Sequence, residues 1–180
     1  MQRWPNVPAV YGWLRLDTAG RWRLEGRPVR HPGLAEFIGR NYLADERGAW
    51  YFQNGPQRVY VELDHAPWVL QLDAQGRLRD QTGALAVLGD RGVIDEECNL
   101  VLSTRRGPAL LGGEALVELI DCLRDAEGRP VTPETLEALM TGEARRGLRF
   151  VRDGHELALE PLAHVEIPAR LGFIRVPEPA

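Results

Sequence analysis

Phe52-Gln-Asn-Gly55, followed by Val59-Tyr-Val-Glu62, consists of two apolar runs on either side of an Asn-Gly turn signal. The arrangement returns later in the chain as Phe150-Val-Arg-Asp-Gly154, followed by Leu157-Ala-Leu-Glu160. Short runs of aromatic and β-branched residues around Asn-Gly or Asp-Gly are typical of β-hairpins. The two stretches therefore predict two hairpins, one in each half of the chain.

A predicted helix precedes each of these hairpins. Leu34-Ala-Glu-Phe-Ile38 and Leu116-Val-Glu-Leu-Ile120 both carry apolar residues at helical spacing. Pro32 suits the first turn of the earlier helix, which we expect to continue to Tyr42. Gly128 lies beyond the later stretch, so we expect the second helix to end near Glu127-Gly128.

Each helix is itself preceded by a hairpin and by a connector that contains Gly and Pro. The order hairpin, connector, helix, hairpin thus occurs twice, which predicts an internal repeat. The alternative is two generic units that share only an apolar pattern, and a superposition of 11–63 on 92–160 would distinguish the two. The leading strands and connectors are expected at 11–17, 21–25 and 26–28, and again at 93–97, 99–103 and 105–108.

The predicted fold class is α+β, rich in strands, with two related strand–helix–strand units. The second unit is expected to carry an extra helix near 132–141, because Thr132-Pro-Glu-Thr135 is typical of a helix start. The predicted boundaries are 11–80 for the first unit, 84–176 for the second, and 1–10 and 177–180 for extended termini. Further strands are expected at 68–72, 76–79, 165–167 and 173–176.

Composition excludes several classes of protein. The chain has 180 residues and a formal net charge of −4, so no overall positive field for nucleic acid is expected. All 22 basic residues are Arg. No stretch approaches the roughly 20 apolar residues of a membrane span, and the first residues do not resemble a signal peptide. We expect a bacterial, cytoplasmic protein without nucleic-acid or membrane partners.

Residues for covalent catalysis or for a cofactor are sparse. Ser103 is the only serine, and Cys98 follows three acidic residues, which would raise the pKa of its thiol. His164-Val-Glu166 could supply two metal ligands from one strand face, and His65 would lie at a related place if the two units pack about a pseudo-twofold axis. We nevertheless predict no catalytic residue, no metal and no cofactor.

Two segments are the candidates for binding a ligand or a partner. Asp64-His-Ala-Pro-Trp68 is a loop with a conspicuous aromatic residue, although a tryptophan belongs by default to the core. Arg105 and Arg106 lie just before a predicted helix, where two guanidinium groups could hold an anion or simply occupy a connector. The predicted binding residues are Asp64, His65, Trp68, Arg105 and Arg106.

Several of these motifs resemble those of a known family of uncharacterised bacterial proteins. The run Gly20-Arg-Trp, then Gly26-Arg-Pro-Val, then Leu34 with Phe37-Ile38, then Val59 to Trp68 is similar to that family's hairpin, helix and strand ending in Asp-Ala-Pro-aromatic. The family has an acidic residue where His65 stands here. The resemblance implies a repeated β/α fold and no established activity, with a suggested role in signal transduction, and it supplies no catalytic residues.

Three hypotheses of function follow from the sequence. The first is a non-enzymatic binding or signalling module for a small molecule or a protein partner. The second is an enzyme of unrecognised type that uses the acidic and His residues of 64–68 and 153–166 between the two units. The third is a structural or assembly subunit, such as a homodimer. For the first two, the groove between the units is the expected site.

Overall fold

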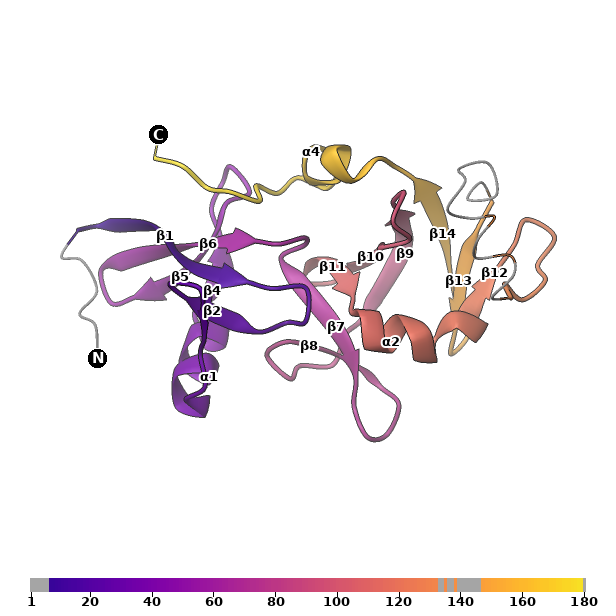
Figure 1. The fold of residues 1–180 in the computed structure, drawn as a ribbon, viewed down its shortest axis with the longest axis horizontal. Helices are drawn as coiled ribbons and strands as arrows, with labels where there is room; N and C mark the ends of the chain where they lie inside the picture. Colours follow the sequence, from indigo (N-terminus) through magenta and orange to yellow (C-terminus); the bar gives the residue numbers. More distant parts are fainter. Residues whose placement is uncertain (1–6, 133–134, 136–137, 139–146, 180) are drawn as a thin grey trace.

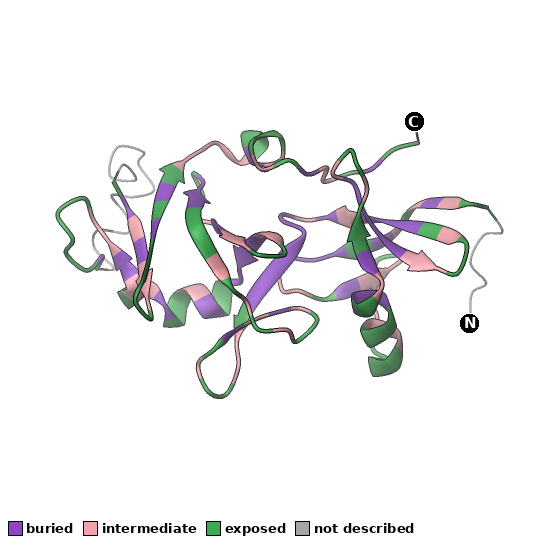
Figure 2. Cartoon of the chain, turned by 180° about the vertical axis from the view of Figure 1, so that it is seen from behind, coloured by how far each residue is buried: buried purple, intermediate pink, exposed green. Residues whose placement is uncertain are grey.

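A computed structural model describes residues 7–132, 135, 138 and 147–179. The protein is a mixed α+β fold in which strands predominate and form two sheets. The two sheets lie beside one another along the long axis of the molecule (Figure 1). Buried residues continue from one sheet to the other through this middle region (Figure 2), so the two sheets share one principal core.

The first sheet has six strands in the order β3-β2-β1-β6-β5-β4. Its central pair, β1 and β6, is parallel, and its other pairs are antiparallel. Helix α1 (Pro32–Arg40) connects its two halves and packs against β5. The strands are β1 (Ala9–Leu16), β2 (Trp22–Leu24), β3 (Arg27–Pro28), β4 (Tyr42–Ala44), β5 (Trp50–Asn54) and β6 (Gln57–Leu63).

The second sheet has eight strands in the order β12-β13-β14-β9-β10-β11-β7-β8. Here β14 and β9 form a parallel pair, and so do β11 and β7. Helix α2 (Gly113–Glu118) follows β11 and packs against β7. The strands are β7 (Trp68–Leu72), β8 (Leu78–Asp80), β9 (Leu88–Ile94), β10 (Leu100–Thr104), β11 (Gly107–Leu111), β12 (Leu123–Arg124), β13 (Arg149–Arg152) and β14 (His155–Pro161).

The strand order within β9 to β14 is the same as the order within β1 to β6. In each set three strands precede a helix and three follow it, and the first strand pairs in parallel with the last. The hairpin of β7 and β8 is added next to β11. Residues 68–80, which the sequence grouped with the first unit, therefore belong to the second sheet.

The predicted helix ends need correction. Tyr42 begins β4 instead of ending α1, and the second helix stops at Glu118. Leu119 caps α2, the 3-10 turn η1 (Ile120–Cys122) follows, and the chain enters β12. Because β-branched and leucine residues at helical spacing also suit a short strand, the apolar pattern alone could not locate these ends.

Several predicted strands and connectors also differ. Residues 105–108 are not only a connector, since Gly107 begins β11, and residues 95–97 form a turn after β9. Residues 165–167 and 173–176 do not add two strands; the former lie in 3-10 turn η2 (His164–Glu166) and in helix α4 (Ile167–Leu171). Pro168 at the start of α4 explains the error, because proline favours a first helical turn. The extra helix predicted near 132–141 lies largely outside the described residues.

Aromatic residues fill the junction between the sheets. The ring of Trp68, from the second sheet, lies 5.2 Å from that of Tyr42 and 5.3 Å from that of Trp50, both from the first sheet. Beyond α4 the chain returns to the first sheet, where the N–H of Leu63 donates to the carbonyl of Arg175 at 2.8 Å (Figure 1). This return ties the end of the chain to the end of β6.

One turn geometry recurs along the chain. An Asp carbonyl accepts the N–H of the third residue after it, and Oδ1 of the same Asp accepts the N–H groups of the second and fourth residues. This side-chain contact is an Asx turn, which holds the tip of a hairpin in one conformation. The turns begin at Asp17, Asp45, Asp73, Asp80, Asp95 and Asp125.

Candidate functional site

The turn at Asp95 departs from the other turns of this type in its sequence. Its third following residue is Cys98, with φ of 61°, where each of the other turns has a Gly with positive φ. A residue with a Cβ is strained in this left-handed conformation by about 1–2 kcal/mol. The fourth following residue is Asn99, whose amide donates to Oδ2 of Asp95 at 2.9 Å.

In all the remaining turns of this type described above, arginine neutralises the carboxylate of the Asp that begins the turn. Arg21 and Arg23 contact Oδ2 of Asp17 at 3.1 and 2.8 Å, and Arg106 contacts Oδ2 of Asp80 at 2.6 Å. The equivalent ion pairs are Arg47 with Asp45, Arg77 and Arg79 with Asp73, and Arg129 with Asp125. Among the described residues, no arginine forms an ion pair with Asp95.

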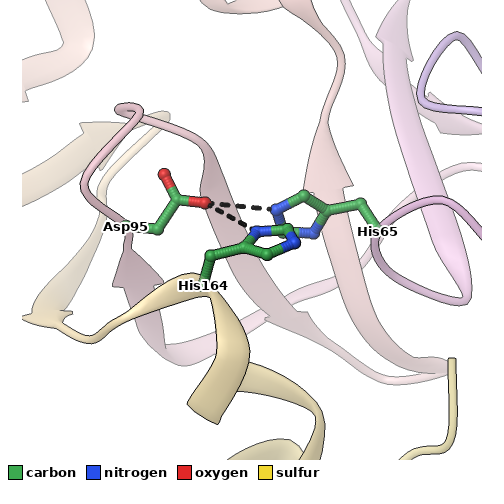
Figure 3. A group of neighbouring side chains, drawn as sticks. All are labelled: His65, Asp95 and His164. Carbon is green, nitrogen blue, oxygen red and sulfur yellow. Dashed lines mark hydrogen bonds and ion pairs between the residues drawn. The ribbon is translucent and has the colours of Figure 1, made fainter.

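Two histidines from distant segments contact Asp95 instead. Nε2 of His65 lies 3.4 Å from Oδ2 of Asp95, and Nδ1 of His164 lies 3.2 Å from the same oxygen (Figure 3). His65 follows β6 in the loop to β7, whereas His164 begins η2 after β14. The two rings meet edge to face with centroids 4.8 Å apart. We call Asp95, His65 and His164 the junction cluster.

The junction cluster is buried. The side chains of Asp95 and His65 are 0% and 4% exposed, and that of His164 is 24% exposed. Burial by itself would raise the pKa of Asp95, but hydrogen bonds from His65, Asn99 and His164 outweigh it and hold that pKa well below its usual range. Asp95 is therefore an ionised carboxylate that is fully buried.

Hydrogen-bond donors and acceptors fix the proton positions in the cluster. An ionised carboxylate only accepts, so Nε2 of His65 and Nδ1 of His164 must each carry a proton. Arg175 has only donors, and its Nη1 donates to Nε2 of His164 at 2.5 Å. Nε2 of His164 is thus an acceptor, and Nδ1 of His65 is buried without a hydrogen-bond partner among the described residues.

Arg175 connects the cluster to the first sheet. Its guanidinium also donates to the carbonyls of Leu63 and Asp64, at 3.3 and 2.6 Å, where β6 ends. The backbone N–H of His164 donates to Glu96, the residue after Asp95, at 2.8 Å. The end of β6, the β9–β10 turn and the C-terminal segment are held together at this one place.

A cavity of about 450 Å³ adjoins the cluster. Thr18, Asp64 and His65 line it from loops that follow strands of the first sheet, and the remaining lining comes from residues 97–164. Leu110, Leu111 and Leu116 form its apolar part, and Glu97, Asn99 and His164 add polar groups. Although every basic residue of this chain other than histidine is Arg, no arginine lines this cavity among the described residues.

The structure separates the predicted binding residues into two groups. Asp64 and His65 line the cavity, as a site between the units would require, although Asp64 also pairs with Arg15 at 3.4 Å. Trp68 is 2% exposed and its indole N–H donates to the carbonyl of Arg106 at 2.8 Å. The Arg106 guanidinium lies 3.9 Å from the Trp68 ring, and Arg105 is exposed at the turn before β11. Trp68 and Arg106 thus pack against each other away from the cavity.

Asp95 and Arg175 were missed by sequence reasoning. The signal for Asp95 was available: Asp followed three residues later by Gly recurs along the chain, and only Asp95 has Cys in place of that Gly among the turns described above. Arg175 had no such signal, because its contacts depend on the path of the segment after α4.

Ser103, Cys122 and His164 are poor candidates for nucleophilic or general-base catalysis. The Ser103 hydroxyl donates to the carbonyl of Arg91 at 2.7 Å, between β10 and β9. Burial raises the pKa of the Cys122 thiol, which disfavours the thiolate. Both ring nitrogens of His164 are already occupied, so this histidine cannot act as a general base without losing a partner.

The fold and the site define an α+β protein of two sheets with a polar cavity at their junction. The chain belongs to the family described as "Protein of unknown function (DUF2946)", whose model, DUF2944, matches residues 1–178. This confirms the expectation of membership in an uncharacterised family. The search among curated proteins gives no match.

Two solved structures are similar to this chain. One is a DUF1285 family protein from Silicibacter pomeroyi DSS-3, with a TM-score of 0.55 and 19% identity over 90% of this chain and 85% of that one. The other is a DUF1285 family protein from Shewanella baltica OS155, with a TM-score of 0.45 and 16% identity over 58% of this chain and 87% of that one. At such identity the first likeness concerns the fold alone. Among the described residues, no helix is long and apolar enough to cross a membrane.

Proposed function

We propose that the protein is a non-enzymatic binding module whose ligand is a small molecule with an ammonium, guanidinium or similar donor group. The observation that carries this proposal is the cavity of about 450 Å³, which is lined from both units and contains carboxylates but no arginine. Ligand sites favour such junctions, and a few polar groups among apolar ones set the specificity.

The charges of the lining favour a cationic ligand. Glu97 is exposed, and from the residues that the structure describes its carboxylate accepts one hydrogen bond, at 3.3 Å from the Asn99 amide. Asp64, which is 34% exposed and pairs with Arg15 at 3.4 Å, also lines the cavity, so two carboxylates are available to a ligand. Leu110, Leu111 and Leu116 would cover the carbon part of such a ligand.

We also infer that the two units are copies of one ancestral motif. The shared strand order and the matching Asp turns between β1 and β2 and between β9 and β10 support a duplication. A ligand that bridges the copies would stabilise one relative placement of the sheets, which suits a role in signalling. A superposition of 11–63 on 92–160 that fails to align these strands would remove this inference.

A thermal-shift screen tests the proposed ligand class. Butane-1,4-diamine, agmatine and spermidine should raise the melting temperature, whereas butane-1,4-diol and succinate should not, because binding to the folded state alone is stabilising. Shifts by the anion and none by the amines would contradict the proposal.

Matched variants locate the site at which an amine that raises the melting temperature binds. Gly113→Leu should abolish it, because a Cβ at Gly113 meets no atom within 4 Å and the new side chain can occupy the cavity. Val117→Leu, on the exposed side of the same helix, is the control. Glu97→Gln should weaken the shift, whereas Glu127→Gln, at the same place in the Asp125 turn, should leave it unchanged.

A further inference from the structure

We infer that the junction cluster is a binding site for a divalent transition-metal ion, with Nε2 of His65, Nδ1 of His164 and Oδ2 of Asp95 as its ligands. One ligand atom of each of the three residues lies within 4.8 Å of the other two. The inference goes beyond the cavity ligand, because the ion would bind to the cluster and not to Asp64 or Glu97. It does not depend on whether an amine occupies the cavity.

The geometry is close to that of a metal site at the two nitrogen–oxygen contacts, whereas separations of up to 4.8 Å among the ligand atoms require the residues to draw together. Zinc binds nitrogen and oxygen at about 2.0–2.2 Å, which holds neighbouring ligand atoms about 3–3.5 Å apart. The two nitrogen–oxygen separations are already 3.4 and 3.2 Å. Oδ1 of Asp95 stays fixed by the N–H groups of Glu97 and Asn99, as second-shell bonds usually fix a ligating carboxylate.

The other Asp turns show what is missing at Asp95. Each of them places a guanidinium on the second carboxylate oxygen, for example Arg23 on Asp17 at 2.8 Å. At Asp95, among the described residues, that oxygen receives an amide and two imidazoles but no guanidinium, although the side chain is fully buried. A divalent cation between the imidazoles would supply the positive charge that arginine supplies elsewhere, and imidazole nitrogens suit a transition metal.

Metal binding requires a change of tautomer in both histidines. The proton of His164 must move from Nδ1 to Nε2, which faces a donor of Arg175, and the proton of His65 must move to Nδ1. No proton leaves the protein, but Arg175 must withdraw from His164. Its bonds to the carbonyls of Leu63 and Asp64 can remain. Arg175 therefore competes with the metal for His164.

Titration calorimetry of the metal-stripped 180-residue chain with Zn²⁺, together with visible absorption of Co²⁺, tests the inference. We expect one ion per chain. His164→Gln should weaken binding at least tenfold, and His155→Gln, an exposed histidine in β14, should leave it unchanged. Arg175→Gln should tighten binding about tenfold, because the glutamine carbonyl can accept the Nε2 proton that metal ligation requires.

Each result of this titration either supports or overturns the proposed metal site. Absence of binding by both the wild-type protein and Arg175→Gln at millimolar metal would overturn the inference, and so would binding that survives His164→Gln or that His155→Gln weakens equally. Binding detected only in Arg175→Gln supports a site that Arg175 holds closed. Amine shifts in the thermal screen without metal binding would leave the proposed function standing and remove this inference alone.

Discussion

The turn at Asp17 and the turn at Asp95 occupy the same place in their sheets, after the first strand of each set. Both carboxylates hold the same backbone N–H groups, yet Asp17 is paired with two arginines and Asp95 with two histidines. The turn thus keeps the same backbone hydrogen bonds whether arginine or histidine contacts its carboxylate. We interpret Asp17 as the structural form of the turn and Asp95 as the form adapted for binding.

The largest effect is expected from removing the carboxylate at Asp95. Asp95→Ala should lower the free energy of unfolding by about 3–5 kcal/mol, since it leaves buried donors of two histidines and of the turn without an acceptor. Urea denaturation measures this. A loss below about 1 kcal/mol would mean that the cluster does not hold the junction.

The next effect concerns a turn that arginine neutralises. Arg106→Ala should cost about 1–2 kcal/mol, because it removes the 2.6 Å ion pair to buried Asp80 and the contact with the Trp68 ring. Its neighbour Arg105 is exposed and is the matched control, so Arg105→Ala should change stability by less than about 0.5 kcal/mol. Equal losses in the same urea measurement would refute a specific role for the arginine at this turn.

A smaller effect on stability is expected at the third residue after the Asp, which is Cys98 in one turn and Gly20 in the other. Cys98→Gly should stabilise the protein by about 0.5–1 kcal/mol, because it relieves a positive φ at a residue with a Cβ. Gly20→Ala at the matching position should destabilise it, since the new Cβ also meets Cβ of Gln81 at 3.2 Å. Thermal unfolding of both variants tests the comparison, which is contradicted if both changes have the same sign.

Acid titration gives the smallest effect. Burial would raise the pKa of Asp17, but hydrogen bonds from Arg21 and Arg23 outweigh it and lower that pKa. A lowered pKa adds stability above the unfolded value, about 3.9, and that stability is lost as the pH falls through the folded value. The stability advantage of the wild-type protein over Asp17→Asn should therefore shrink from pH 5 downward. An advantage that does not change with pH would contradict this.

The sequence predicted the hairpins at Asn54-Gly55 and Asp153-Gly154 and the start of α1 at Pro32, because these depend on neighbouring residues. It misplaced the end of α2 and the segment after β14, where packing decides between helix and strand. The junction cluster joins residues 30 and 69 positions apart, from Asp95 to His65 and to His164. Such contacts depend on the strand order. The predicted repeat suggested only that His65 and His164 could lie at related places in the two units.

Converting the Asp95 turn into the form found at Asp17 tests the central claim most directly. The double variant Cys98→Gly/Asn99→Arg restores Gly and Arg at the positions that Gly20 and Arg21 hold in the first sheet. Its Zn²⁺ affinity should fall at least tenfold in titration calorimetry while its melting temperature is kept or raised, because arginine would then neutralise Asp95. An unchanged Zn²⁺ affinity in this folded variant would contradict the account.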